Sequence, residues 1–215
     1  MVINEKKTKN LIFNFTEKYQ FSTRLWLNDE IIEILESTKL LGTIISNDLR
    51  WDLNTKNIVK KANARMELLR RVASFGTPVE DMKNVYFLFI RSLLEQSATV
   101  WHSSLTEENS ADLERVQKCA TRIILGNKYV GYKDALLKLD IEKLSDRREE
   151  LCLKFAQKCI KNPKTKHMFP ESAKNHTMKT RMEEKFKVEH ANTERLRKSS
   201  IIYMQHLLNE KELKK

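Results

Sequence analysis

Lysine and arginine side chains recur at helical spacing between residues 54 and 73, and phosphate binding is the chemistry that this pattern favours. On an ideal helix, Lys56, Lys60 and Arg71 lie within about 60° of one another, opposite an apolar stripe. Such cations contact phosphate and sugar without reading base sequence. An ordinary solvated face is the alternative, because charge runs on amphipathic helices are common. The candidate nucleic-acid-binding residues of this helix are Lys56, Lys60, Lys61, Arg65, Arg70 and Arg71.

A second basic face follows on a helix that we expect to begin around residues 106–110 and to end at Gly126. Arg115, Lys118 and Arg122 share one side of this helix, and apolar residues occupy the other. The same two interpretations apply here, a contact with phosphate or a solvated face. The apolar residues are Leu113, Val116, Ala120, Ile123 and Ile124.

Catalytic motifs are missing from the sequence. It contains no Asp-Asp pair, no Gly-rich phosphate loop, no Gly-x-Ser-x-Gly, no His-Glu-x-x-His and no Cys-x-x-Cys. Neighbouring acids such as Glu107 and Glu108 point apart on a helix and cannot share a substrate. The three cysteines, Cys119, Cys152 and Cys159, lack metal-ligand spacing and are expected to be buried free thiols. We therefore expect no catalysis by this chain alone, no metal site and no cofactor.

The charge balance favours a polyanionic partner. Lys and Arg number 40 against 29 Asp and Glu, a net charge of +11, and phosphate contacts supply most non-specific affinity for nucleic acid. A basic solvated tail is the alternative. No apolar run approaches the ~18–20 residues of a membrane span, and the amino terminus has no signal-peptide core. The expected setting is intracellular, in nucleus or cytoplasm, without a membrane.

Short strands are expected in residues 1–53 and helices after them. Leu11, Phe13 and Phe15 alternate with polar residues, and Asn28-Asp29 is a turn signal. Residues 39–45 are typical of a buried strand, with Gly42 where another group approaches the backbone closely. Two or three short strands do not form a stable sheet alone.

The helical part begins near Asn54. Residues 77–80 form a capping box before a helix whose apolar stripe is expected in the core. Residues 142–161 form a further helix, whose stripe at 3–4 spacing includes Arg148. Trp101 is expected in a polar connection, where it and Trp51 either stack on bases or cap the core. The stripe of the capped helix comprises Met82, Val85, Tyr86, Phe89, Ile90, Leu93 and Leu94.

The expected fold is α+β and predominantly α, in three parts. Residues 1–53 are a small β unit, 54–163 a helical bundle, and 164–215 a basic tail. Within the tail, 164–193 is expected to be loosely ordered, and 194–213 to form a helix that needs a partner surface.

A series of short segments is distinctive in its order and spacing: Asn4-Glu5-Lys6-Lys7-Thr8-Lys9, Lys39-Leu40-Leu41-Gly42 followed by Leu49-Arg50-Trp51, Lys60-Lys61-Ala62-Asn63, Leu68-Leu69-Arg70-Arg71, Phe89-Ile90-Arg91-Ser92-Leu93-Leu94-Glu95, Val100-Trp101, Leu113-Glu114-Arg115-Val116-Gln117 followed by Ala120-Thr121-Arg122-Ile123, and Lys166-His167-Met168-Phe169-Pro170 to Ile201-Ile202-Tyr203-Met204. This series resembles the carboxy-terminal part of jockey-like non-LTR retrotransposon reverse transcriptases, which comprises the end of the palm, the thumb and the tail. One departure is Leu40, where this family usually has an aromatic residue.

The resemblance implies an RNA-directed DNA polymerase whose thumb packs against RNA or an RNA–DNA hybrid. It assigns Lys39, Leu41 and Gly42 to a primer-grip-like strand, for which a plain core strand is the alternative. The catalytic aspartates that hold Mg²⁺ in this class would lie in upstream polymerase domains ahead of Asn4. Other readings are a helical protein-interaction module that docks through the 78–98 stripe and the 194–213 helix, or a functionless remnant of a mobile element.

Overall fold

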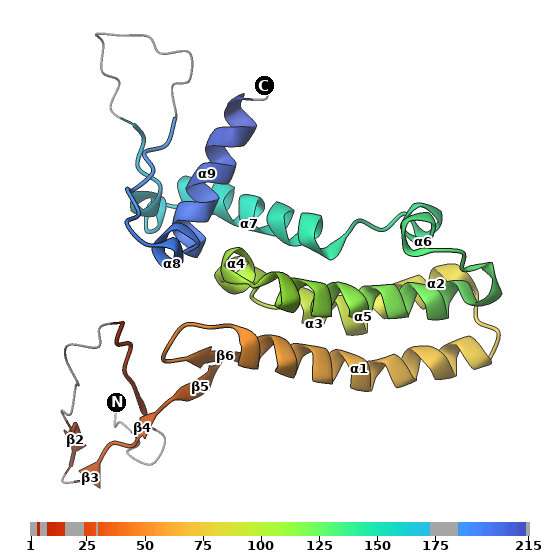
Figure 1. Cartoon of the computed structure of the whole chain (residues 1–215), viewed down its shortest axis with the longest axis horizontal. Helices are drawn as coiled ribbons and strands as arrows, with labels where there is room; N and C mark the ends of the chain where they lie inside the picture. The colour runs from red at the N-terminus through yellow and green to blue at the C-terminus, as the bar shows by residue number, and fades with distance from the viewer. Residues whose placement is uncertain (1–3, 5–7, 16–23, 29, 173–184, 214–215) are drawn as a thin grey trace.

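The structure, a computed structural model, describes residue 4 and residues 8–15, 24–28, 30–172 and 185–213 (Figure 1). Short strands come first and helices follow, so the predicted α+β, predominantly helical fold is confirmed. Within the described residues the strands form three separate two-stranded sheets. The pairs are β1 (Asn10–Leu11) parallel to β4 (Ile34–Leu35), β2 (Trp26–Leu27) antiparallel to β3 (Glu30–Ile31), and β5 (Ser37–Leu40) antiparallel to β6 (Thr43–Ser46).

The single buried strand predicted for residues 39–45 is instead a hairpin. Leu41 and Gly42 have φ angles of 48° and 91°, and two successive left-handed residues make the tight turn that joins β5 to β6. Leu41 is 90% exposed at the tip. The close approach predicted at Gly42 is present, because a Cβ there would collide with the Gln96 amide nitrogen. The turn at Asn28 is also present, with φ of 47°, while Asp29 lies outside the described residues.

Three long rods form the main bundle. The first is α1 (Asp52–Ser74), and the third is α5 (Glu107–Leu125), which runs parallel to it. The second rod runs back antiparallel to both, packs against both, and comprises α2 (Val79–Val85), the π-helix η2 (Tyr86–Arg91) and α3 (Ser92–Glu95). The predicted apolar faces of α1 and α5 form the core between the rods. Its fully buried members include Ala62, Met66, Leu69, Tyr86, Ile90, Leu94, Leu113 and Ala120.

The π turn explains which side chains of the second rod are buried. Met82, Tyr86, Ile90 and Leu94 are all buried and are spaced by four residues. In a regular α-helix each step of four residues drifts by about 40°, so these side chains would spread around the rod. The wider π turn absorbs the drift and keeps them on one face. Phe89 consequently lies outside the core with 45% of its surface exposed, so its predicted burial was wrong.

The helix ends follow the predicted signals in part. Thr106 accepts a hydrogen bond from the Asn109 amide at 3.1 Å and starts α5, and Gly126 ends it with φ of 50°. The capping box at residues 77–80 was wrong. Thr77 Oγ1 donates to the Val72 carbonyl at 2.8 Å, and no side chain caps α2.

The remaining helical elements complete the described part of the chain. The eight-residue helix α6 was not predicted, since two turns give little periodicity. Trp101 does not lie in a polar connection: it ends α4 with no exposed surface, and its Nε1 donates to the Gln96 carbonyl at 3.0 Å. The elements are α4 (Ala98–Trp101), η3 (His102–Ser104), η4 (Gly126–Lys128), α6 (Tyr132–Leu139), α7 (Leu144–Lys161), η5 (Lys166–Met168), α8 (Glu194–Arg197) and α9 (Ser200–Leu213).

A second core lies between α7 and the carboxy-terminal segment. Met204 and Leu208 of α9 pack with Cys152 and Cys159 of α7. The helix predicted over 194–213 is broken between α8 and α9, and its partner surface is α7 of the same chain. The expectation of loose order for 164–193 holds poorly where residues are described, because Phe169 and Phe186 are buried; residues 173–184 lie outside the described ranges.

Candidate nucleic-acid interface

The amino-terminal half of α1 carries three lysines, none of which has an ion-pair partner in the described part of the chain. Lys56 and Lys60 are exposed and Lys61 is half-buried. Among the residues that the structure describes, none of the three makes a hydrogen bond or an ion pair with a side chain. Three ammonium groups on two turns of helix are thus available to a polyanion.

The arginines of α1, unlike its lysines, make ion pairs or hydrogen bonds with described residues. Arg70 and Arg71 both lie 3.5 Å from the Glu67 carboxylate, and all three side chains are exposed. Such surface pairs contribute about 0–1 kcal/mol, so a phosphate can replace the carboxylate at little cost. Arg65 differs, because its Nη1 donates to the Phe89 carbonyl at 2.7 Å and ties α1 to the π turn. It retains further donors, since a guanidinium has five N–H groups.

The basic side chains of α5 are exposed but differ in their neighbours. Arg115 lies 2.5 Å from Asp112, one turn away, and is therefore partly neutralised. The guanidinium of Arg122 lies 5.2 Å from the Tyr129 ring centroid, over the ring. Lys118 has no ion pair within the described part of the chain. Of this group, Lys118 and Arg122 are the cations not held by a carboxylate.

One rigid core carries both helices. The Asn109 amide donates to Asp52 Oδ1 at 2.8 Å and fixes the start of α5 beside the start of α1. The buried side chains of α1 and α5 then belong to the same core. The structure therefore brings the nine predicted cations onto two adjacent helices that cannot move independently.

The primer-grip-like residues lie in the hairpin, which two amide side chains fasten to the bundle. The Ile44 backbone N–H donates to Asn54 Oδ1 at 3.0 Å, and Gln96 Nε2 donates to the Leu41 carbonyl at 3.3 Å. Lys39 is exposed on β5. The hairpin thus sits at the end of α1 that carries Lys56.

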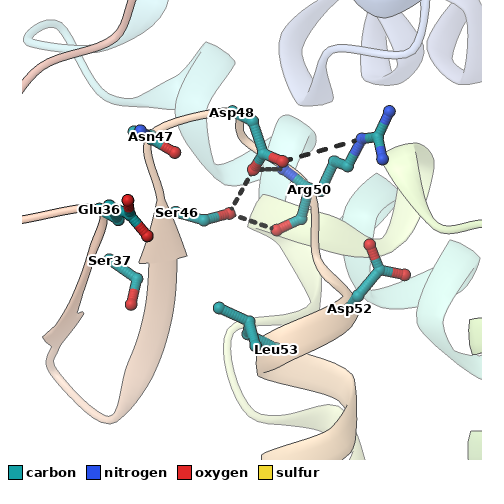
Figure 2. A pocket seen from close by; sticks show the side chains of 8 residues that line it. All are labelled: Glu36, Ser37, Ser46, Asn47, Asp48, Arg50, Asp52 and Leu53. Atoms are coloured by element: carbon teal, nitrogen blue, oxygen red, sulfur yellow. Dashed lines mark hydrogen bonds and ion pairs between the residues drawn. The ribbon is translucent and has the colours of Figure 1, made fainter.

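Sequence reasoning missed a half-open pocket of about 210 Å³ between the hairpin and α1 (Figure 2). Asp48 Oδ1 accepts hydrogen bonds from Ser46 Oγ at 2.7 Å and from the Arg50 backbone N–H at 2.9 Å. The Ser46 bond is the main reason that the pKa of Asp48 lies below its ordinary value. With Glu36 and Asp52 also on the wall, the pocket repels phosphate. The signal was the spacing of Ser46, Asp48 and Arg50, which suits a turn closed by an Asp side chain.

The described residues contain no group of three side chains placed to hold a metal ion. The burial predicted for the thiols is found for Cys152 and Cys159, while Cys119 is partly exposed, and all three are free. Burial raises the pKa of Cys152 to about 11. None of the described helices combines the length and apolar character needed to cross a bilayer.

Trp51 and Trp101 are both buried, so neither can stack on a base. Trp101 is instead buried where α4, η3, α5 and α7 meet, close to the polar side chains of Arg148 and His102. Arg148, fully buried on α7, lies over Trp101 with its guanidinium carbon 5.8 Å from the ring centroid. Its Nε donates to His102 Nδ1 at 3.3 Å. Desolvation, and then the charge of Arg148, lower the pKa of His102 to about 4. The sequence signal for this junction was Arg148, because it stands within a predicted apolar stripe.

A second buried polar group joins the second rod, α5 and α6. Tyr86 donates to Gln117 Oε1 at 2.5 Å, and Gln117 Nε2 donates to Tyr132 Oη at 2.9 Å. Tyr132 in turn donates to Glu114. Desolvation raises the pKa of Tyr86 well above its ordinary value, so the Tyr86 hydroxyl stays protonated and donates to Gln117 inside the bundle.

Comparisons of the chain with models of protein families, with curated proteins and with solved structures found no match.

Proposed function

We propose that this chain binds RNA or an RNA–DNA hybrid through the basic faces of α1 and α5. The observation that supports this most is a group of cations that, among the described residues, have no carboxylate partner: Lys56, Lys60 and Lys61 on α1 with Lys118 and Arg122 on α5. They stand on helices that share one core. Binding would proceed by contact with phosphate and release of counterions, so it would be strongly salt-dependent and tolerant of base sequence.

In the proposed setting the chain is the thumb and carboxy-terminal part of a non-LTR retrotransposon RNA-directed DNA polymerase. This rests on the resemblance in residues 4–160. Polymerisation and its Mg²⁺ would belong to upstream palm domains, and this chain alone would position the nucleic acid. In that setting Lys39 on β5 and the turn residues Leu41 and Gly42 would form the part of the hairpin nearest the primer.

The test is fluorescence anisotropy with a labelled blunt RNA–DNA hybrid, titrated over salt. We expect micromolar or tighter binding at low salt and a linear fall of log affinity with log salt. Lys60→Glu with Arg71→Glu should weaken binding at least tenfold, since two contacts become repulsive. Lys133→Glu with Lys143→Glu is the matched control: it makes the same charge change at exposed sites on and after α6. Equal losses in both pairs, with unchanged helical content, would refute the assigned face.

A protein-interaction module is the second candidate. Most of the surfaces first considered for it are covered within the chain, since Met82 and Leu94 lie in the first core and Met204 and Leu208 in the second, while Phe89 of the 78–98 stripe is exposed. What favours it now is the exposure of apolar side chains before residue 50, with Trp26 on β2 and with Leu40 and Leu41 on the β5–β6 hairpin. An apolar docking surface would bind with little salt dependence, which separates the two candidates.

A further inference from the structure

The π turn η2 holds Phe89 at the surface on a fixed backbone. π turns within helices occur frequently at functional sites. Here two side chains bond successive carbonyl groups of the turn. Ser92 Oγ donates to the Leu88 carbonyl at 2.6 Å, and Arg65 Nη1 donates to the Phe89 carbonyl at 2.7 Å. The ring of Phe89 is therefore carried by a segment anchored to α1 rather than by a loop.

The Phe89 ring is exposed to solvent, whereas the ring of Phe87, two residues before it, is covered. The guanidinium of Arg91 covers the Phe87 ring at 3.7 Å from the centroid. Within the described residues, Phe89 has no aromatic or cation–π partner, and 45% of its surface is exposed. An open phenylalanine face offers stacking to a planar group.

Arg65 places a cation on the backbone that carries this ring, because its Nη1 donates to the Phe89 carbonyl. Lys61 lies one turn before Arg65 and thus on the same side of α1. Proteins that hold unpaired nucleotides combine cations along the nucleic-acid backbone with aromatic side chains on which bases stack. An exposed aromatic ring on a segment held by an arginine fits this combination.

We propose that Phe89 stacks on an unpaired base of a bound RNA or DNA strand, whose phosphates contact Lys61 and Arg65. This rests on the proposed function and adds a specificity to it, a preference for strands with unpaired nucleotides over blunt duplex. Stacking of this kind tolerates any base, because every base has a π face.

The experiment compares a blunt RNA–DNA hybrid with the same hybrid carrying a short unpaired extension, both measured by fluorescence anisotropy. Phe89→Ala should weaken binding of the extended hybrid about fivefold or more and leave the blunt hybrid within twofold. Phe155→Ala is the matched control, because Phe155 on α7 is also 45% exposed. It should change neither affinity.

A second measurement places 2-aminopurine in the unpaired extension. Wild-type protein and Phe89→Tyr should quench its fluorescence, whereas Phe89→Leu, which keeps apolar bulk without a ring, should not. If Phe89→Ala lowers both affinities equally, or neither, or if Phe89→Leu quenches like wild type, the stacking site is refuted while the duplex interface stands. If wild type binds neither hybrid, the proposed function falls and the stacking site with it.

Discussion

The first 50 residues and the helical part differ in how they use apolar side chains. In the described portion of residues 4–50, eight large hydrophobic side chains are exposed, and no side chain is a buried member of either core. In the helical part, tyrosine, tryptophan and even arginine are fully buried. Two-stranded sheets are marginal alone, and β6 packs against α1, so the hairpin gains stability from the bundle.

Net charge also differs between residues 1–50 and residues 51–215. Residues 1–50 contain seven Lys and Arg and seven Asp and Glu, so the whole net charge of +11 belongs to residues 51–215. The described residues before Trp51 include no buried member of either core, whereas both cores and the whole net charge belong to residues 51–215. Large apolar side chains are exposed in both regions, among them Leu41 and Phe75.

Truncating a tryptophan in each region should give the largest contrast. We expect Trp101→Ala to lower the free energy of unfolding by about 3–5 kcal/mol, because it opens a cavity in the core. Trp26→Ala, at a side chain 63% exposed, should change it by less than about 0.5 kcal/mol. Urea unfolding followed by circular dichroism measures both. Similar losses would show that the strand region is as tightly packed as the bundle.

Acid should destabilise the helical junction at His102. In the folded chain burial keeps this imidazole neutral down to about pH 4, while in the unfolded chain it takes up a proton near its ordinary pKa of 6.5. Below pH 6.5 the unfolded state thus binds more protons, and stability falls as the pH drops. We expect a loss of about 1–2 kcal/mol between pH 7 and pH 5, measured by urea unfolding.

His102→Gln supplies the control, because it removes the imidazole and keeps a hydrogen-bonding group beside Arg148. Its loss between pH 7 and pH 5 should be smaller by most of that amount. An undiminished loss would place the responsible group elsewhere.

Gly42→Ala should weaken the attachment of the β5–β6 hairpin to the helical bundle. Its φ of 91° strains any side chain, and the new Cβ would collide with the Gln96 amide. Gly126→Ala meets the φ strain alone, with nothing near the Cβ. We expect Gly42→Ala to cost about 1 kcal/mol more than Gly126→Ala. Hydrogen exchange of the Ile44 amide reports it, and adding Gln96→Ala should recover part of the loss.

Glu67→Gln should have the smallest effect on stability, below about 0.5 kcal/mol, because its ion pairs are exposed. It releases Arg70 and Arg71, so affinity for the RNA–DNA hybrid should rise a few-fold at low salt. Glu150→Gln, which breaks two ion pairs on α7, is the control and should leave affinity unchanged. A gain of equal size in both variants would indicate that net charge alone sets the affinity.

The long helices were predictable because their periodicity extends over many turns. For α1, α5 and α7 the apolar stripe located the core, and Thr106 and Gly126 located two helix ends. The hairpin at residues 39–45 was not predictable, since a run of apolar residues around one glycine fits a single strand equally well. Phe89 was misplaced because the winding of a helix is set by the neighbours that its side chains meet.

The candidate site was predictable only in part. Exposure of Lys56 and Lys60 follows from the stripe opposite them. The bond from Arg65 to the Phe89 carbonyl joins residues 24 positions apart, and no local pattern predicts it. Burial of Arg148 likewise depends on His102 and Ser110, which come from other elements.

The parallel packing of α1 beside α5 has a consequence for synthesis of the chain. Roughly 50 residues separate the end of α1 from the end of α5. At typical rates of elongation the ribosome needs about 3–10 s to make them. Throughout that interval the stripe of Ile58, Met66 and Leu69 lacks its final partner, so newly made α1 is a target for chaperones until α5 emerges.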